Sequence, residues 1–132
     1  MSTYDLVIKN GKIVTSGDSY VADIGVKDGK VIEIATCIDG ENVYDAKGKY
    51  LIPGGIDVHT HLDMPFCGTF SSDDFLTGTK AAAIGGTTTV VDYAIQPGGK
   101  TLKDAIDIWK EKAEGKAVID YGFHLAVTNL DD

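Results

Sequence analysis

Residues 53–63 read PGGIDVHTHLD, and this stretch separates two parts of the chain that follow different patterns. Before it, short runs of β-forming residues alternate with turn residues, whereas after it predicted strands alternate with predicted helices. The stretch itself predicts a strand over residues 56–62 that follows a Pro-Gly-Gly turn. We therefore expect two structural parts, residues 1–52 and residues 53–132.

The first part predicts a small antiparallel β unit. Asn10-Gly11 lies between two β-forming runs, and this dipeptide is the strongest short-range signal for a hairpin turn. Residues 22–27 alternate between apolar residues and polar residues or glycine, which predicts a strand with one apolar face. Asp28-Gly29 predicts a turn into the next strand, and residues 42–46 predict a further short strand.

The second part predicts an α/β fold. Its expected elements are a strand over 56–62, a helix over 71–84, a strand over 87–93 covered on both faces, a helix that begins at Thr101 and ends at Gly115, and a strand over 118–128. Ser71 and Asp74 have the spacing of a capping box, and so do Thr101 and Asp104. Strands joined by helices pair in parallel through right-handed crossovers. Both a doubly wound sheet and the opening of a (β/α)₈ barrel of about 250 residues fit this order.

The candidate chemistry lies in the histidine pair of the quoted stretch. On a strand, His59 and His61 share a face with Cα atoms roughly 6.5 Å apart, so both imidazoles can reach one metal ion. They end the first parallel strand, where α/β folds place their active sites. We therefore predict that both are metal ligands. Asp57 is interpreted as a structural carboxylate rather than a third ligand, and the lone His124 as a core group rather than a functional one.

Composition excludes several classes of partner. Twenty acidic against 12 basic residues give a formal charge of −8 without a basic cluster, so neither nucleic acid nor a membrane surface is expected as a partner. The sequence contains no stretch of 18 apolar residues and no signal peptide pattern. Its two cysteines do not make a disulfide framework. The expected compartment is the cytoplasm.

Three segments carry a resemblance to a known family: residues 53–66 (PGGIDVHTHLDMPF), 85–89 (GGTTT) and 115–124 (GKAVIDYGFH). They resemble the dihydropyrimidinase and hydantoinase family of the amidohydrolase superfamily, and the similarity extends in order over essentially the whole chain. The resemblance implies that residues 1–52 form strands of a small β-sandwich. It also implies that residues 53–132 form the first three strands and two helices of a (β/α)₈ barrel.

The resemblance further implies two divalent metal ions, most often zinc, bridged by a carboxylated lysine that we expect beyond Asp132. His59 and His61 match the first two metal ligands of the family, and no catalytic residue is expected within this portion of the chain. The implied reaction opens the cyclic amide of hydantoins or dihydropyrimidines to N-carbamoyl amino acids, by attack of a metal-bridging hydroxide. We expect residues 1–132 alone to be inactive and poorly folded. The implied assembly is a homotetramer or a dimer acting on a small cyclic amide.

Alternatives within the same resemblance remain. Dihydroorotases usually carry an arginine where this sequence has Asp63, and that arginine pairs with the substrate carboxylate, so Asp63 disfavours dihydroorotate. An allantoinase type is also open. Non-catalytic, dihydropyrimidinase-like interaction proteins lack the metal ligands, so the two histidines argue against that class. A freestanding βα binding domain would leave an open sheet edge.

The loop after the histidines is the expected substrate-binding segment. Met64 and Phe66 are the candidates for contact with the exocyclic group of the substrate, and ordinary loop packing is the alternative. Residues 94–100 are a weaker candidate for a second wall. Cys67 stands where glycine is common in the family, and it either narrows the pocket or fills space.

Overall fold

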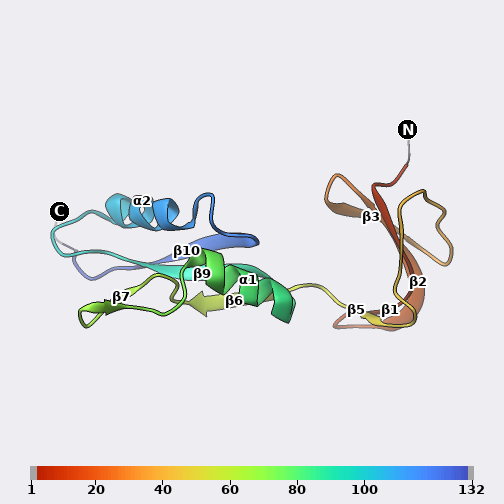
Figure 1. Ribbon diagram of the computed structural model, residues 1–132, viewed down its shortest axis with the longest axis horizontal. Coiled ribbons are helices and arrows are strands. Elements are labelled where there is room, and N and C mark those ends of the chain that lie inside the picture. The colour runs from red at the N-terminus through yellow and green to blue at the C-terminus, as the bar shows by residue number, and fades with distance from the viewer. Residues whose placement is uncertain (1–2, 131–132) are drawn as a thin grey trace. The chain divides into compact units, whose positions relative to one another are not determined.

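The computed structural model describes residues 3–130 and divides the chain into two compact units, Met1–Pro53 and Gly54–Asp132 (Figure 1). Each unit contains its own main β-sheet. Over residues 3–130, no helix has the length and apolar character that crossing a membrane requires.

The Met1–Pro53 unit is a five-stranded sheet of mixed direction. Its strands are β1 (Leu6–Val14), β2 (Ser19–Lys27), β3 (Lys30–Ala35), β4 (Val43–Asp45) and β5 (Tyr50–Leu51). The order is β3-β2-β1-β4, and β5 also pairs with β1. The first three strands are antiparallel as predicted, but β4 and β5 run parallel to β1, so the expectation of a wholly antiparallel unit is wrong. The reason is that the loop after β3 returns the chain to the end of the sheet where β1 begins.

The predicted hairpin turn at Asn10-Gly11 is also wrong, because β1 continues through it. The pairing of β1 with β2 shifts between Ile8 and Gly11, and Asn10 adopts a φ of 58°. The Asn10 N–H donates to Asp23 Oδ1 at 3.0 Å, so the amide at the irregularity is satisfied by a side chain. A left-handed residue followed by glycine suits a β-bulge as well as a turn. The turn predicted at Asp28-Gly29 is confirmed, with φ values of 49° and 70°.

The Gly54–Asp132 unit is built on a parallel sheet in the order β10-β9-β6, which confirms the α/β class. The strands are β6 (Gly55–Thr60), β9 (Thr87–Ile95) and β10 (Asp120–Ala126), and the connecting helices are α1 (Phe75–Gly85) and α2 (Leu102–Ala113). Between β6 and α1 the chain forms a small antiparallel hairpin of β7 (Pro65–Phe66) and β8 (Thr69–Phe70). Sequence reasoning did not predict this hairpin.

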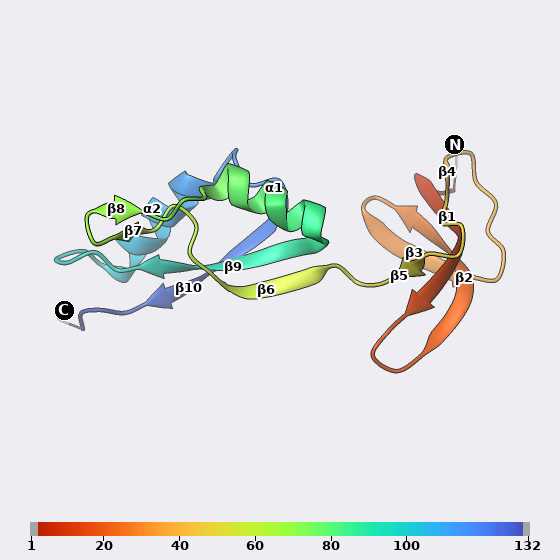
Figure 2. The ribbon, with the colours of Figure 1, turned by 60° about the horizontal axis from the view of Figure 1, so that its bottom comes forward.

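Both helices pack on one face of the parallel sheet, as Figure 2 shows for α1 and α2. Phe75 from α1, Trp109 and Ala113 from α2, and Ala94 from β9 form a single buried cluster. Along β9, Val90, Asp92 and Ala94 face the helices and are buried, whereas the residues between them are half-buried. The expectation that this strand is covered on both faces is therefore not met within the described residues. The uncovered face is the one that carries the histidines.

The helix caps show how far local patterns decide the boundaries. Thr101 caps α2 with Asp104 in a capping box, as predicted. Helix α1 begins later than predicted, because Asp74 rather than Ser71 is its N-cap and pairs with Thr77. The Thr77 backbone N–H holds the pKa of the Asp74 carboxyl below its usual value of 3.8. Gly86 ends the helix with a φ of 90°.

Candidate functional site

The two histidines lie together at the carboxyl end of β6. His59 is the penultimate residue of β6, and His61 is the first residue after the strand ends. Their ring centroids are 5.2 Å apart and the ring planes are inclined by 79°. Both side chains are exposed, so the prediction that they share one face agrees with the structure.

This separation fits two ligands of one metal ion. Zinc binds imidazole nitrogens at about 2.0–2.1 Å, so in a tetrahedral site two such rings have centres about 5 Å apart. Within residues 3–130, no group of three or more His, Cys, Asp or Glu side chains is arranged to hold an ion. The described residues therefore offer a pair of candidate ligands and not a complete coordination shell.

Tyr93 and His124 extend the histidine pair across the sheet. The Tyr93 ring, from β9, lies 4.6 Å from His59, 5.4 Å from His61 and 4.9 Å from His124 between centroids. His124, from β10, is within hydrogen-bond distance of the Val58 carbonyl through Nε2, at 3.1 Å. His124 is therefore hydrogen-bonded, but it is exposed and not a core residue as the sequence suggested. Tyr93 was missed because nothing in a β-branched run marks one aromatic residue as part of a site.

The Asp57 side chain forms a hydrogen bond with the backbone of its own strand, β6. Its Oδ1 atom accepts the backbone N–H of His59 at 3.1 Å. The pairing of β6 with β9 shifts between Asp57 and Thr60, and the carboxylate satisfies an amide inside this irregular segment. This hydrogen bond supports the structural interpretation of Asp57.

Asp92 is a second carboxylate near the histidines that sequence reasoning missed. Its side chain is fully buried and accepts three hydrogen bonds. Thr60 Oγ1 and the Leu62 backbone N–H donate to Oδ2 at 2.9 and 2.7 Å, and Trp109 Nε1 donates to Oδ1 at 3.0 Å. The available signal was an aspartate inside an apolar strand, because a buried carboxylate requires partners.

The loop after the histidines is shaped by its own hairpin. Met64 is half-buried, and its backbone N–H donates to Ser71 Oγ at 2.8 Å while its carbonyl accepts from the Ser71 N–H at 2.8 Å. Phe66 is 64% exposed. Cys67 and Gly68 form the turn with φ values of 48° and 80°, so the cysteine occupies a conformation that favours glycine. Both cysteines of the chain, at positions 37 and 67, are free and exposed.

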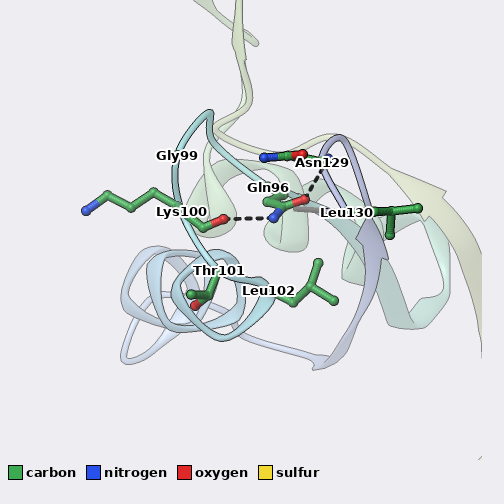
Figure 3. Close-up of a pocket in the computed structure, with 7 residues that line it drawn as sticks. All are labelled: Gln96, Gly99, Lys100, Thr101, Leu102, Asn129 and Leu130. Atoms are coloured by element: carbon green, nitrogen blue, oxygen red, sulfur yellow. Dashed lines mark hydrogen bonds between the residues drawn. The ribbon is translucent and has the colours of Figure 1, made fainter. Parts of the chain in front are cut away.

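A cavity of about 610 Å³ lies where β9 and β10 end. Its lining residues are Gln96, Gly99, Lys100, Thr101, Leu102, Asn129 and Leu130. The Gln96 side chain joins the two loops, because its Nε2 donates to the Lys100 carbonyl at 2.7 Å and its Oε1 accepts from the Asn129 N–H at 3.0 Å (Figure 3). The two histidines do not line this cavity. Gln96, Gly99 and Lys100 belong to the segment expected as a second substrate wall, and that role stays a prediction.

Comparisons with known proteins agree with this architecture. Residues 50–132 match the model of the amidohydrolase family. The chain is 56% identical over 128 residues to the D-hydantoinase of Geobacillus stearothermophilus, covering 96% of this chain and 27% of that protein. The crystal structure of dihydropyrimidinase from Brevibacillus agri NCHU1002 matches 96% of this chain and 28% of its own, with a TM-score of 0.91 and 55% identity. The D-hydantoinase structure from Bacillus sp. AR9 has a TM-score of 0.93 at 52% identity, covering 97% of this chain and 28% of its own.

The chain thus spans about 28% of the length of the relatives that it matches. Within that span, the parallel sheet with its two helices and the histidine pair lie inside the matched residues 50–132. By the extent of that match, the chain belongs to the amidohydrolase family.

Proposed function

We propose that the intact protein is a metal-dependent hydrolase of the hydantoinase or dihydropyrimidinase type. It would open the ring of hydantoins or dihydropyrimidines to give N-carbamoyl amino acids. The observation that carries the proposal is the His59–His61 pair, with rings 5.2 Å apart at the carboxyl end of β6, in a chain 56% identical to a D-hydantoinase. In this proposal, the Met1–Pro53 unit belongs to a β-sandwich and the Gly54–Asp132 unit to a (β/α)₈ barrel.

The proposed roles follow from the side chains on the exposed face of the sheet. His59 and His61 would hold a divalent ion, zinc in the first instance, through neutral imidazole nitrogens. Two bound ions would supply a water of lowered pKa and a polarised ring carbonyl. Asp57 accepts a hydrogen bond from the His59 backbone, and the Tyr93 ring packs against both imidazoles.

Neutral rings are the proposed substrates. Asp63 stands where a carboxylate-binding arginine would be needed for dihydroorotate. Lys112 Nζ lies 3.9 Å from Asp63 Oδ2, so the negative charge of Asp63 is partly compensated. Discrimination against dihydroorotate therefore depends more on the missing arginine than on repulsion by Asp63. Met64 and Phe66 would contact the exocyclic group of the ring.

The test uses the intact protein with bound metal. Zinc content and turnover of hydantoin and dihydrouracil should both be lost in His59→Ala and in His61→Ala. His124→Gln is the matched control, because His124 lies on the same face but bonds to a carbonyl, and it should keep its zinc. Full zinc content in both alanine variants would contradict the proposal.

The proposal includes a homo-oligomer, tetrameric or dimeric, located in the cytoplasm. Light scattering coupled to size-exclusion chromatography measures the subunit number. A monomer at micromolar concentration would contradict this part of the proposal.

A further inference from the structure

Among residues 54–130, the most deeply buried acidic group lies behind the histidine pair. Asp92, in the middle of β9, is 0% exposed. Its three hydrogen-bond donors come from the end of β6 and from α2, so one carboxylate joins three elements. A buried carboxylate is costly unless several donors satisfy it, and this one is satisfied on both oxygens.

We infer that Asp92 is a positioning residue that sets the geometry of the His59–His61 pair, an inference that rests on the proposed function. Two of its donors, Thr60 Oγ1 and the Leu62 N–H, belong to the residues on either side of His61. Thr60 is also the residue between the two histidines. Both donors bond to the same oxygen, at 2.9 and 2.7 Å, so the backbone of residues 60–62 is held at two points.

The third donor connects this anchor to the core. Trp109 is 2% exposed and belongs to the cluster that packs α1 and α2 on the sheet. Leu62, the residue after His61, packs against the same cluster. The strand end is therefore tied to the buried core of the unit, while the imidazoles project from the other face toward Tyr93. Partners that orient metal ligands typically change metal affinity about 10- to 100-fold when they are removed.

Asparagine at position 92 tests this arrangement with little change of shape. An amide has one acceptor oxygen and one NH₂ group, so its NH₂ group must face at least one donor. Asp92→Asn therefore breaks either the anchor at Thr60 and Leu62 or the bond from Trp109. Thr60→Val and Thr60→Ser form a second, gentler pair, because valine removes the hydroxyl at constant shape whereas serine keeps it.

Asp23 provides a matched control in the other unit. It is also a buried carboxylate, 5% exposed, and it accepts the backbone N–H groups of Asn10 and Ile38, each at 3.0 Å. Asp23→Asn should destabilise the protein through loss of a comparable structural interaction. It lies in the Met1–Pro53 unit, whereas both histidines belong to the Gly54–Asp132 unit.

The experiment measures the dissociation constant for Zn²⁺ alone in the intact, metal-stripped protein, by competition with a chromophoric chelator, beside its thermal unfolding. Asp92→Asn and Thr60→Val should raise the zinc dissociation constant about 10- to 100-fold. Thr60→Ser should keep the wild-type value, and Asp23→Asn should keep it while lowering the melting temperature. The absorption spectrum of the Co²⁺-substituted protein should change in the first two variants only.

Wild-type zinc affinity in Thr60→Val would overturn the inference, and so would equal losses in Asp23→Asn and Asp92→Asn. If Asp92→Asn does not fold, the zinc affinities of Thr60→Val and Thr60→Ser still show whether the anchor sets the geometry of the histidine pair. Failure of the proposed function is a different result, since His59→Ala and His61→Ala would then keep their zinc.

Discussion

The Nζ atom of Lys112 donates a hydrogen bond to the backbone carbonyl of Asp63, so helix α2 holds the chain two residues after the second histidine. Lys112 is only 18% exposed at its side chain. Its ammonium group lies over the Trp109 ring, 4.5 Å from the centroid, and 5.9 Å from the Phe70 centroid. Asp63 itself adopts a φ of 49°, a conformation that needs such support in a residue other than glycine.

We predict that Lys112→Met loosens the β7–β8 hairpin. Hydrogen bonds from charged groups contribute about 1.5–3 kcal/mol, so amide protection in residues 63–71 should fall about tenfold or more. Hydrogen exchange followed by mass spectrometry measures this change. Lys103→Met is the control, because Lys103 lies on the same helix and pairs with the exposed Asp107 instead. Equal protection in both variants would show that Lys112 does not hold the hairpin.

Substrate preference should favour hydantoin or dihydrouracil over dihydroorotate, because Asp63 replaces the arginine that an anionic ring requires. Values of kcat/KM for the three substrates in the intact protein measure the preference. Faster turnover of dihydroorotate than of both neutral rings would contradict the assignment of the substrate class.

Phe66→Ala should change the ratio of kcat/KM between hydantoins with large and small 5-substituents. A pocket contact of this size changes the kcat/KM ratio between two such substrates by about 10- to 200-fold. Phe70→Ala is the matched control, because Phe70 lies on the paired strand with 61% exposure against 64% for Phe66 and is directed toward Lys112. An equal loss on all substrates in Phe66→Ala would indicate a structural role instead.

Acid should weaken the cap of helix α1. The Thr77 N–H, more than any other contact, lowers the folded-state pKa of Asp74 below 3.8, the ordinary value expected in the unfolded chain. A lowered folded-state pKa means that the stabilisation is fully present above pH 3.8 and is lost as the pH falls through the folded-state value. The melting temperature of Asp74→Ala should therefore differ from wild type more at pH 6 than at pH 2.5. Asp73→Ala removes a neighbouring charge without removing the cap, and the same pH dependence there would contradict the assignment.

Several elements could be predicted because their signals are short in sequence. The α2 cap needs only Thr101 and Asp104, three residues apart, and the structure agrees. The same spacing at Ser71 and Asp74 misplaced the start of α1, because the pattern occurs twice in a row there and Ser71 bonds to Met64 instead. At Asn10, one backbone conformation serves both a turn and a bulge, so the dipeptide could not decide between them.

The sequence by itself determined the α/β alternation of the second unit and the common face of His59 and His61, since both follow from the period of a strand and from caps a few residues apart. Only the tertiary structure decided which residues support them. Asp92 lies 32 positions from Thr60, and Lys112 lies 49 positions from Asp63. Such contacts depend on strand register and on the face where α2 packs, and no local pattern encodes either. For that reason the candidate ligands could be identified in the sequence, but their anchor and the support of the following loop could not.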